Sequence, residues 1–119
     1  LIEPEPYSTL KIKADPNQFK QVIWNLLVNA IQAMPQGGDL KISIKQADAK
    51  HVLIEVTDSG IGIPQNKIKN IFDPFYSTKD DGTGLGLAIV HQIIESHKGK
   101  IQVESAAGQG ATFRIFWPM

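Results

Sequence analysis

The sequence contains no cysteine, carries no net charge and has no long apolar run, and each absence excludes a class of protein. Without cysteine the chain forms neither a disulfide nor a thiolate metal site, which fits a reducing compartment. Twelve basic and twelve acidic residues cancel, so we expect no nucleic-acid partner and no contact with an acidic membrane. No segment approaches the roughly 20 apolar residues of a membrane helix, and no signal peptide is visible at Leu1.

The sequence does hold enough apolar residues to build the core of one domain. It has 119 residues, of which 42% are hydrophobic. Residues 1–8 are acidic and rich in proline, and we interpret them as a linker or a ragged first strand. Residues 9–119 are then the domain itself. Because the chain does not begin with methionine, we expect it to be a domain cut from a longer protein.

The strongest helix signal runs from Asp15 to Met34. Asp15 is a good N-cap, Pro16 suits the first helical position, and Gln18 completes a capping-box pattern. Apolar residues recur at helical spacing and predict a face packed on a core. They are Phe19, Val22, Ile23, Leu26, Leu27, Ala30, Ile31 and Met34.

Alternating apolar stretches predict the other elements. We expect strands over 9–14, 39–46, 51–58, 100–105 and 111–117, a short helix over 63–71, and a long helix from 85 to about 97 that Gly99 caps. Short turns join neighbouring strands into hairpins, and helices do not separate successive strands. The fold class is therefore α+β, a two-layer α/β sandwich in which helices cover one face of a mixed, mostly antiparallel sheet.

Two glycine clusters are the main functional signal: DSGIG at 58–62 ends a strand, and GTGLG at 82–86 opens a helix. Glycine lets backbone approach a flat or anionic ligand, and a helix N-terminus attracts phosphate. Asp58, at the strand end, can accept a hydrogen bond from the amine of adenine. These features predict a nucleotide pocket. An Asp-Ser-Gly turn and a flexible hinge before a helix are the alternatives.

Other nucleotide motifs are absent, since the sequence has neither GxGxxG after a strand nor GxxxxGK[ST]. Asn25 and Asn29 lie one helical turn apart, and an Asn29 carbonyl suits Mg²⁺, which takes only one or two protein oxygens. Lys79 can reach a terminal phosphate. A solvated face is the alternative interpretation for the asparagines, and for Lys79 as well.

The three histidines do not form a metal site or a catalytic triad. His51, His91 and His97 have no acidic cluster at metal-ligand spacing, and we interpret them as structural or surface residues. Serine nucleophiles are not predicted either, because no serine has an evident base within its motif.

Five motifs in order carry a family resemblance. QVIWNLLVNAIQAM is similar to an N box, DSGIGI and GTGLGLAIV to two glycine boxes, FDPFYSTK to an F box, and GQGATF to the last box. The chain thus resembles the catalytic ATP-binding domain of bacterial sensor histidine kinases, which has the Bergerat-type fold. That superfamily includes DNA gyrase, the ninety-kilodalton heat-shock chaperone and the MutL mismatch-repair ATPase. The residues of the FYSTK and GTGLGLAIV segments are most similar to those of nitrogen-regulation and sporulation-type kinases.

The resemblance implies a role for each candidate residue. Asp58 would bind the adenine amine, Asn29 would ligate Mg²⁺, and Asn25 would support the phosphate side. Asn25, Asn29 and Lys79 would be the catalytic residues. The remaining ATP contacts would come from the glycine boxes, the F box and the last box: Gly60, Gly62, Ile63, Phe72, Phe75, Lys79, Gly82, Thr83, Gly84, Leu85, Gly86, Leu87 and Thr112.

Three positions depart from relatives in informative ways. Gln32 stands where many relatives have a basic residue, which argues against a phosphate contact there. Ala111 replaces a serine or threonine, which argues against a water-bridged contact to adenine. Asn25 stands where hydrolytic members have a glutamate base. Because an amide cannot take a proton from water, the resemblance implies phosphoryl transfer to a protein rather than hydrolysis.

The implied acceptor is a histidine on a separate dimerising hairpin, which would pass the phosphoryl group to a response regulator. None of the three histidines here is followed by an acidic residue, so we expect the isolated chain to be a monomer that binds ATP without phosphorylating itself. The implied location is the cytoplasm, with membrane anchoring of the parent protein left open. The alternatives are a serine kinase of the anti-sigma-factor type, a nucleotide-binding module without transfer activity and a hydrolytic ATPase.

Overall fold

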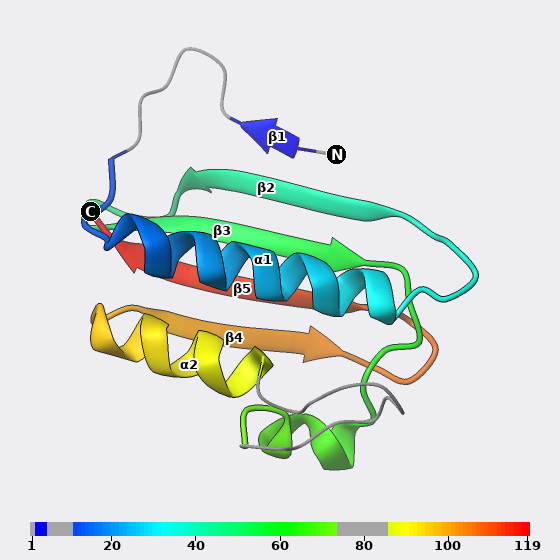
Figure 1. The fold of residues 1–119 in the computed structure, drawn as a ribbon. Helices are drawn as coiled ribbons and strands as arrows, with labels where there is room; N and C mark the ends of the chain where they lie inside the picture. Colours follow the sequence, from blue (N-terminus) through cyan, green and yellow to red (C-terminus); the bar gives the residue numbers. More distant parts are fainter. Residues whose placement is uncertain (1, 5–10, 74–85) are drawn as a thin grey trace.

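The computed structural model describes residues 2–4, 11–73 and 86–119, which form one five-stranded sheet with two helices on one face (Figure 1). The elements are β1 (Ile2–Pro4), α1 (Pro16–Gln32), β2 (Leu40–Gln46), β3 (His51–Asp58), the short 3₁₀ helix η1 (Gln65–Asn70), α2 (Gly86–Ser96), β4 (Lys100–Ser105) and β5 (Ala111–Pro118). The strand order is β1-β2-β3-β5-β4. None of the helices in these residues is long and apolar enough to cross a membrane. The predicted α+β sandwich is confirmed.

The sheet is mixed because β1 runs parallel to β2, whereas the other three pairs are antiparallel. Residues 2–4 form a short first strand, which is one of the two interpretations given for residues 1–8. The β2–β3 and β4–β5 pairs are the two expected hairpins. Residues 11–14, in contrast, are not in a strand, so that part of the strand predicted over 9–14 is wrong. Residues 9 and 10 lie outside the described part.

The 11–14 segment instead packs across the end of β5. The Lys13 N–H donates to the Pro118 carbonyl (3.3 Å), and the Trp117 indole Nε1–H donates to the Lys13 carbonyl (3.0 Å). Ile12 and Ala14 lie against the core. Both backbone groups of Lys13 are thus hydrogen-bonded at the end of β5 and not within a strand ladder. This explains why the alternating pattern here does not produce a strand.

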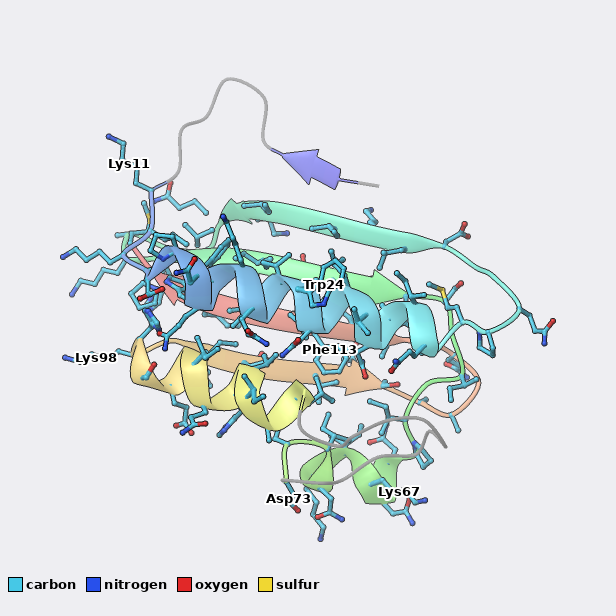
Figure 2. All side chains as sticks on the ribbon, viewed as in Figure 1. Lys11, Trp24, Lys67, Asp73, Lys98 and Phe113 are labelled. Carbon is cyan, nitrogen blue, oxygen red and sulfur yellow. The ribbon has the colours of Figure 1, made fainter. Side chains whose placement is uncertain are left out.

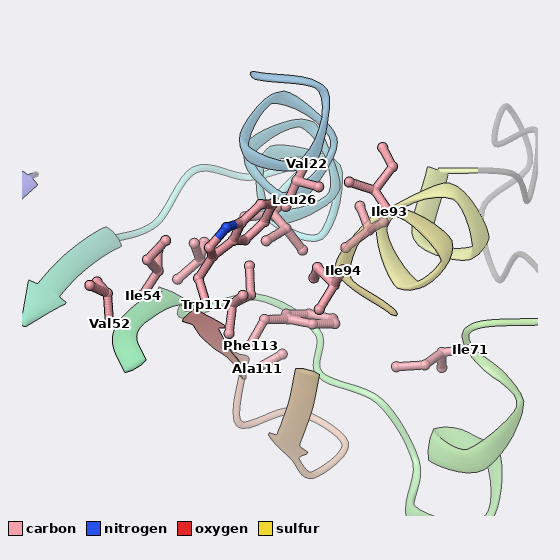
Figure 3. Close-up of a cluster of buried hydrophobic side chains, with 14 residues drawn as sticks. Val22, Leu26, Val52, Ile54, Ile71, Ile93, Ile94, Ala111, Phe113 and Trp117 are labelled. Atoms are coloured by element: carbon pink, nitrogen blue, oxygen red, sulfur yellow. The ribbon is translucent and has the colours of Figure 1, made fainter. Parts of the chain in front are cut away.

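Alternation along β3 and β5 decides which side chains enter the core. Every second residue of both strands is buried, and on β5 these are Ala111, Phe113, Ile115 and Trp117. Val22 and Leu26 from α1 and Val90 and Ile94 from α2 close over them (Figure 3). The register places Asp58, the last buried residue of β3, opposite Ala111. A carboxylate is therefore held on the helix-covered face.

The start of α1 is capped as predicted, with one difference. The Asp15 Oδ1 accepts hydrogen bonds from the backbone N–H groups of Asn17 (2.9 Å) and Gln18 (3.0 Å). The N–H of Asp15 donates to the Nε2 of His97, 3.2 Å away, and not to a side chain three residues ahead. His97 also contacts Trp117, with ring centroids 5.0 Å apart and planes inclined by 42°. A residue beyond the end of α2 thus ties the two helices together.

The predicted apolar face of α1 is wrong at Ile31, which is 60% exposed. At about 100° per residue, Ile31 lies only about 20° from Trp24 around the helix, on the outer side. Trp24 is itself 66% exposed and projects away from the sheet (Figure 2). Val22, Leu26 and Ala30 form the buried centre of the stripe.

The end of α2 differs from its prediction too. Lys98, not Gly99, is the left-handed residue (φ 62°), and it forms a Schellman motif with two hydrogen bonds. The Gly99 N–H donates to the Ile94 carbonyl (2.9 Å) and the Lys98 N–H to the Glu95 carbonyl (3.0 Å). Gly99 is needed for another reason, since a Cβ there would lie 2.8 Å from the Phe116 carbonyl oxygen.

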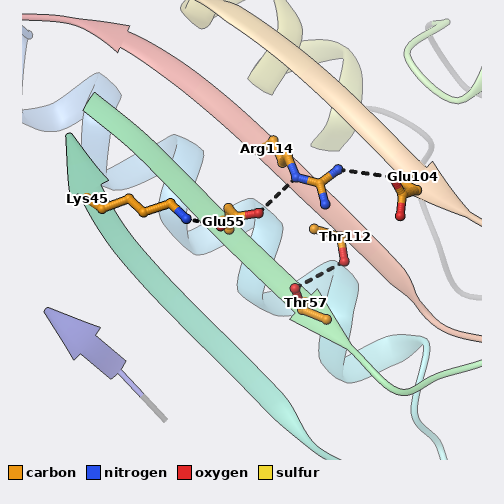
Figure 4. A network of polar contacts seen from close by, with 6 residues as sticks. All are labelled: Lys45, Glu55, Thr57, Glu104, Thr112 and Arg114. Carbon is orange, nitrogen blue, oxygen red and sulfur yellow. Dashed lines mark hydrogen bonds and ion pairs between the residues drawn. The ribbon is translucent and has the colours of Figure 1, made fainter. Parts of the chain in front are cut away.

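The sheet face away from the helices is polar (Figure 4). Glu55 accepts a hydrogen bond from the Nε–H of Arg114 (2.8 Å) and lies 3.7 Å from the Lys45 Nζ. Arg114 also reaches Glu104 at 3.4 Å. The hydrogen bond that Arg114 donates to Glu55 raises the pKa of the Arg114 guanidinium. Charged residues along these strands keep the open face hydrated.

Lys98→Gly should stabilise the domain by about 0.5–1 kcal/mol, because glycine adopts a positive φ without a Cβ penalty and this gain exceeds its entropy cost. Urea denaturation at neutral pH would measure the change. Lys100→Gly is the matched control, because the same substitution within β4 should destabilise. A lower denaturation midpoint for Lys98→Gly would contradict the expectation.

Candidate functional site

Asp58 is the centre of the site. It ends β3 on the helix-covered face and is only 4% exposed. Its Oδ1 accepts a hydrogen bond from the Gly60 N–H at 2.8 Å. No other hydrogen-bond donor to this carboxylate is found in the described part of the chain. A buried carboxylate oxygen without a donor is costly, so the geometry favours a ligand that brings an N–H or O–H group.

The loop after Asp58 bonds directly to the end of α1. The Ile61 N–H donates to the Ala33 carbonyl at 2.9 Å. A Cβ on Gly60 would lie 2.2 Å from that same carbonyl oxygen. Glycine is therefore required at position 60 because two backbones touch there.

The other side of this loop is held by the β4–β5 turn. The Gly110 N–H donates to the Gly60 carbonyl (3.0 Å), and the Gly108 N–H donates to the Ile61 carbonyl (2.6 Å). Gly62 has a φ of 72°, and a Cβ there would lie 2.0 Å from the Ala106 carbonyl oxygen. The loop is thus fixed between α1 and the turn, and both of its glycines serve contacts within the protein.

Ser105 anchors the end of the loop, a role that the sequence motifs did not indicate. The Ile63 N–H donates to the Ser105 Oγ (2.8 Å), and that hydroxyl donates to the Gly110 carbonyl (2.5 Å). The Gln65 side-chain amide donates to the Ser105 carbonyl. The signal was in the strand pattern, because Ile101, Val103 and Ser105 alternate toward the core and only the last is polar.

The two asparagines lie on the side of α1 toward α2. The Asn25 Nδ2 donates to the carbonyl of Gly86, the first residue of α2, at 3.3 Å. Asn29 is half-buried, one turn further along the same face and one turn before Ala33. The asparagine face therefore leads from the N-terminus of α2 to the loop beside Asp58. A Cβ on Gly86 would meet no atom of the described residues within 4 Å, and Leu87 packs against the core.

Phe72 connects the site to α2. It packs against the core and stacks on the His91 ring, with centroids 5.2 Å apart and planes inclined by 28°. The His91 Nδ1 lies 3.2 Å from the Glu95 Oε1. Phe72 therefore joins the segment after η1 to α2.

Thr112, another predicted site residue, lies on the sheet face opposite to that of Asp58. Its hydroxyl lies 3.1 Å from that of Thr57, and both side chains are on the open face of the sheet (Figure 4). Strand alternation is the reason, because Ala111 takes the helix-facing position opposite Asp58. Of the other candidates, Phe75, Lys79, Gly82, Thr83, Gly84 and Leu85 lie outside the described residues.

Metal-binding clusters were absent from the sequence, and the described residues contain no group of three or more His, Cys, Asp or Glu that could hold a metal ion. A cation at this site would depend on few protein ligands. The Asn29 carbonyl oxygen is of the kind that Mg²⁺ accepts alongside water and phosphate.

Known proteins are similar over nearly the whole chain. Residues 14–119 match the family described as histidine kinase-, DNA gyrase B- and HSP90-like ATPase. Sporulation kinase E of Bacillus subtilis is 50% identical over 108 residues, which are 91% of this chain and 15% of that kinase. The chain spans no more than a quarter of the length of the curated relatives it matches first.

Two solved structures share the fold. The catalytic domain of histidine kinase ThkA, in a nucleotide-free form, superposes with a TM-score of 0.85 and 40% identity, covering 98% of this chain and 76% of that one. Full-length ShkA in complex with AMPPNP gives a TM-score of 0.83 and 32% identity, covering 98% of this chain and 25% of that one.

Gly60→Ala should lower the free energy of unfolding by about 2–3 kcal/mol, because the added methyl overlaps a backbone oxygen that cannot rotate away. Gly86→Ala is the matched control, since its methyl meets no atom of the described residues within 4 Å, and it should stay within about 0.5 kcal/mol of the unaltered chain. Urea denaturation measures both. A Gly60→Ala variant as stable as the unaltered chain would show that the loop does not need this backbone contact.

Proposed function

The chain belongs to the family of histidine kinase-, DNA gyrase B- and HSP90-like ATPases, and we propose that it is the ATP-binding catalytic domain of a sensor histidine kinase. The name of the similar sporulation kinase E and the titles of the structural neighbours support the kinase branch. AMPPNP, which the ShkA title names, is an ATP analogue, and this supports ATP as the nucleotide here.

The observation that carries the proposal is the buried Asp58 carboxylate. One of its oxygens accepts from the Gly60 N–H, and no donor to the second is found among the described residues on the helix-covered face. Adenine presents an exocyclic amine that needs an acceptor, whereas guanine presents a carbonyl oxygen at that position. The carboxylate therefore selects for adenine. Its loop is already fixed by protein contacts, so little ordering is required when the base enters.

The phosphates would lie toward the N-terminus of α2, where the helix dipole favours negative charge. Asn25 holds the first residue of that helix through the Gly86 carbonyl. Mg²⁺ would be held by the Asn29 carbonyl oxygen together with phosphate and water, and it would supply charge neutralisation. Lys79 and the glycines at 82 and 84 remain proposed phosphate contacts.

In the proposed reaction the γ-phosphoryl group moves to a histidine on a separate domain of the parent protein. The bond from phosphorus to the β–γ bridging oxygen breaks, and a bond to an imidazole nitrogen forms. The chain's residues contribute by positioning rather than by covalent chemistry. A response regulator would be the later recipient. We place the domain in the cytoplasm as a monomer in isolation.

The histidines of this chain are engaged in structure, which supports an external acceptor. His97 bonds through its Nδ1 to the Ile93 carbonyl (2.8 Å) and through its Nε2 to the Asp15 N–H. His51 contacts Asp48, and His91 contacts Phe72 and Glu95. Hydrolysis is disfavoured because Asn25, at the glutamate position of hydrolytic relatives, cannot act as a base.

Asp58→Asn should weaken Mg-ATP binding roughly 30- to 150-fold, equivalent to about 2–3 kcal/mol, in calorimetric titration. Asparagine keeps an oxygen for the Gly60 N–H and replaces the other oxygen with an amide that cannot accept from adenine. Asp48→Asn, at an exposed carboxylate on the β2–β3 turn, is the control and should bind like the unaltered chain. Equal affinity for all three would remove Asp58 from the proposed pocket.

The isolated chain should take no label from γ-labelled ATP, whereas an added histidine-bearing hairpin domain from a matched kinase should become labelled. The acid and alkali stability of the product identifies the acceptor. A phosphohistidine is lost in acid and survives alkali, and a phosphoserine behaves in the opposite way. Label on the isolated chain would contradict the external acceptor, and an acid-stable product would favour the serine-kinase alternative.

A further inference from the structure

We infer that Ser105 is a positioning residue for base recognition, an inference that rests on the proposed function. Ser105 does not touch the place where adenine would bind. It acts through the loop 59–63, whose far end it holds. The hydroxyl is the only side-chain group that bonds this loop to the β4–β5 hairpin among the described residues.

The register places Ser105 in one row with the proposed base acceptor. Ser105 pairs with Ala111, and Ala111 pairs with Asp58, so the three residues lie side by side across β4, β5 and β3. All three face the helices and are nearly buried, with exposures of 8%, 7% and 4%. The row therefore has a polar group at each end and a methyl between them.

The two ends of the row hold the two ends of the same loop. Asp58 accepts from the Gly60 N–H at the start (2.8 Å), and Ser105 accepts from the Ile63 N–H at the end (2.8 Å). The same hydroxyl donates to the Gly110 carbonyl, and Gly110 in turn donates to the Gly60 carbonyl. A series of hydrogen bonds through Gly110 thus connects Ser105 to Gly60, whose N–H bonds to the Asp58 carboxylate.

Removing this hydroxyl leaves two groups without their present partner, the N–H of the half-buried Ile63 and the carbonyl of the buried Gly110. Water has little access to Ser105, so the loop or the turn should move to satisfy them. Movement at position 63 is passed to Gly60 through the short loop, and it changes where the second Asp58 oxygen points. Base selectivity should then fall more than phosphate binding does.

The test compares Ser105→Ala with Ser105→Thr, which keeps the hydroxyl, and with Ser43→Ala, a serine on the open face of β2 away from the site. Affinities for Mg-ATP and Mg-GTP are measured for each by calorimetric titration. Amide hydrogen exchange at Ile63 is followed without nucleotide, and urea denaturation reports stability.

Ser105→Ala is expected to bind Mg-ATP about tenfold more weakly, to lose most of its preference for ATP over GTP, and to exchange the Ile63 amide faster. Ser105→Thr should restore the preference, and Ser43→Ala should match the unaltered chain. If Ser105→Ala does not fold, Ser105→Cys, which has a weak donor of similar size, is judged by the same criteria.

Two results would overturn the inference while leaving the proposed function standing. One is an unchanged ATP-to-GTP preference in Ser105→Ala. The other is an equal loss of affinity for Mg-ATP and Mg-GTP that is fully accounted for by the loss of stability. A serine with a purely structural role would give that result. Failure of the unaltered chain to bind Mg-ATP would overturn the proposed function and this inference with it.

Discussion

Direct backbone contact around the loop 59–63 is the constraint on which the rest of the site depends. The loop bonds to α1 through the Ala33 carbonyl and to the β4–β5 turn through Gly108 and Gly110. Each contact joins two main chains and leaves no room for a side chain at positions 60 and 62. Because the end of a helix, the end of a strand and a hairpin turn meet here, the position of Asp58 is fixed by the fold as a whole and not by local flexibility.

This arrangement gives the glycines a different meaning from the one their pattern suggests. Glycines before a helix or after a strand are usually taken as an approach route for a ligand. Here Gly60 and Gly62 bring protein backbone against protein backbone, and the proposed binding feature is the carboxylate that their contacts hold in place. A base that binds at Asp58, as proposed, would meet a loop that protein contacts have already fixed, which would lower the entropy cost of binding.

The helices and strands were predicted well because hydrophobic periodicity and helix caps depend on residues close together in the sequence. Asp15 caps α1 as its position indicated, and β3 begins and ends at the predicted residues. The errors came from tertiary contacts: the 11–14 segment bonds to the end of β5, and Gly99 is needed by the backbone of Phe116 and not by the helix end. For the site, motif order predicted both Asp58 and Thr112. The strand alternation that places Thr112 on the open face, and the register that aligns Ser105 with Asp58, are not contained in a motif.

Helix α1 connects the hydrophobic core to the candidate site. Val22, Leu26 and Ala30 bury one face in the core, while Asn25 and Asn29 line the margin that leads to the site. At its end, Ala33 supports the loop beside Asp58. A shift of this helix would disturb core packing, the asparagine face and the loop together. A substitution can change binding without changing stability only if every buried backbone group keeps its hydrogen-bond partner. For that reason, a substitution of similar size at a buried polar atom distinguishes a binding role from a structural one.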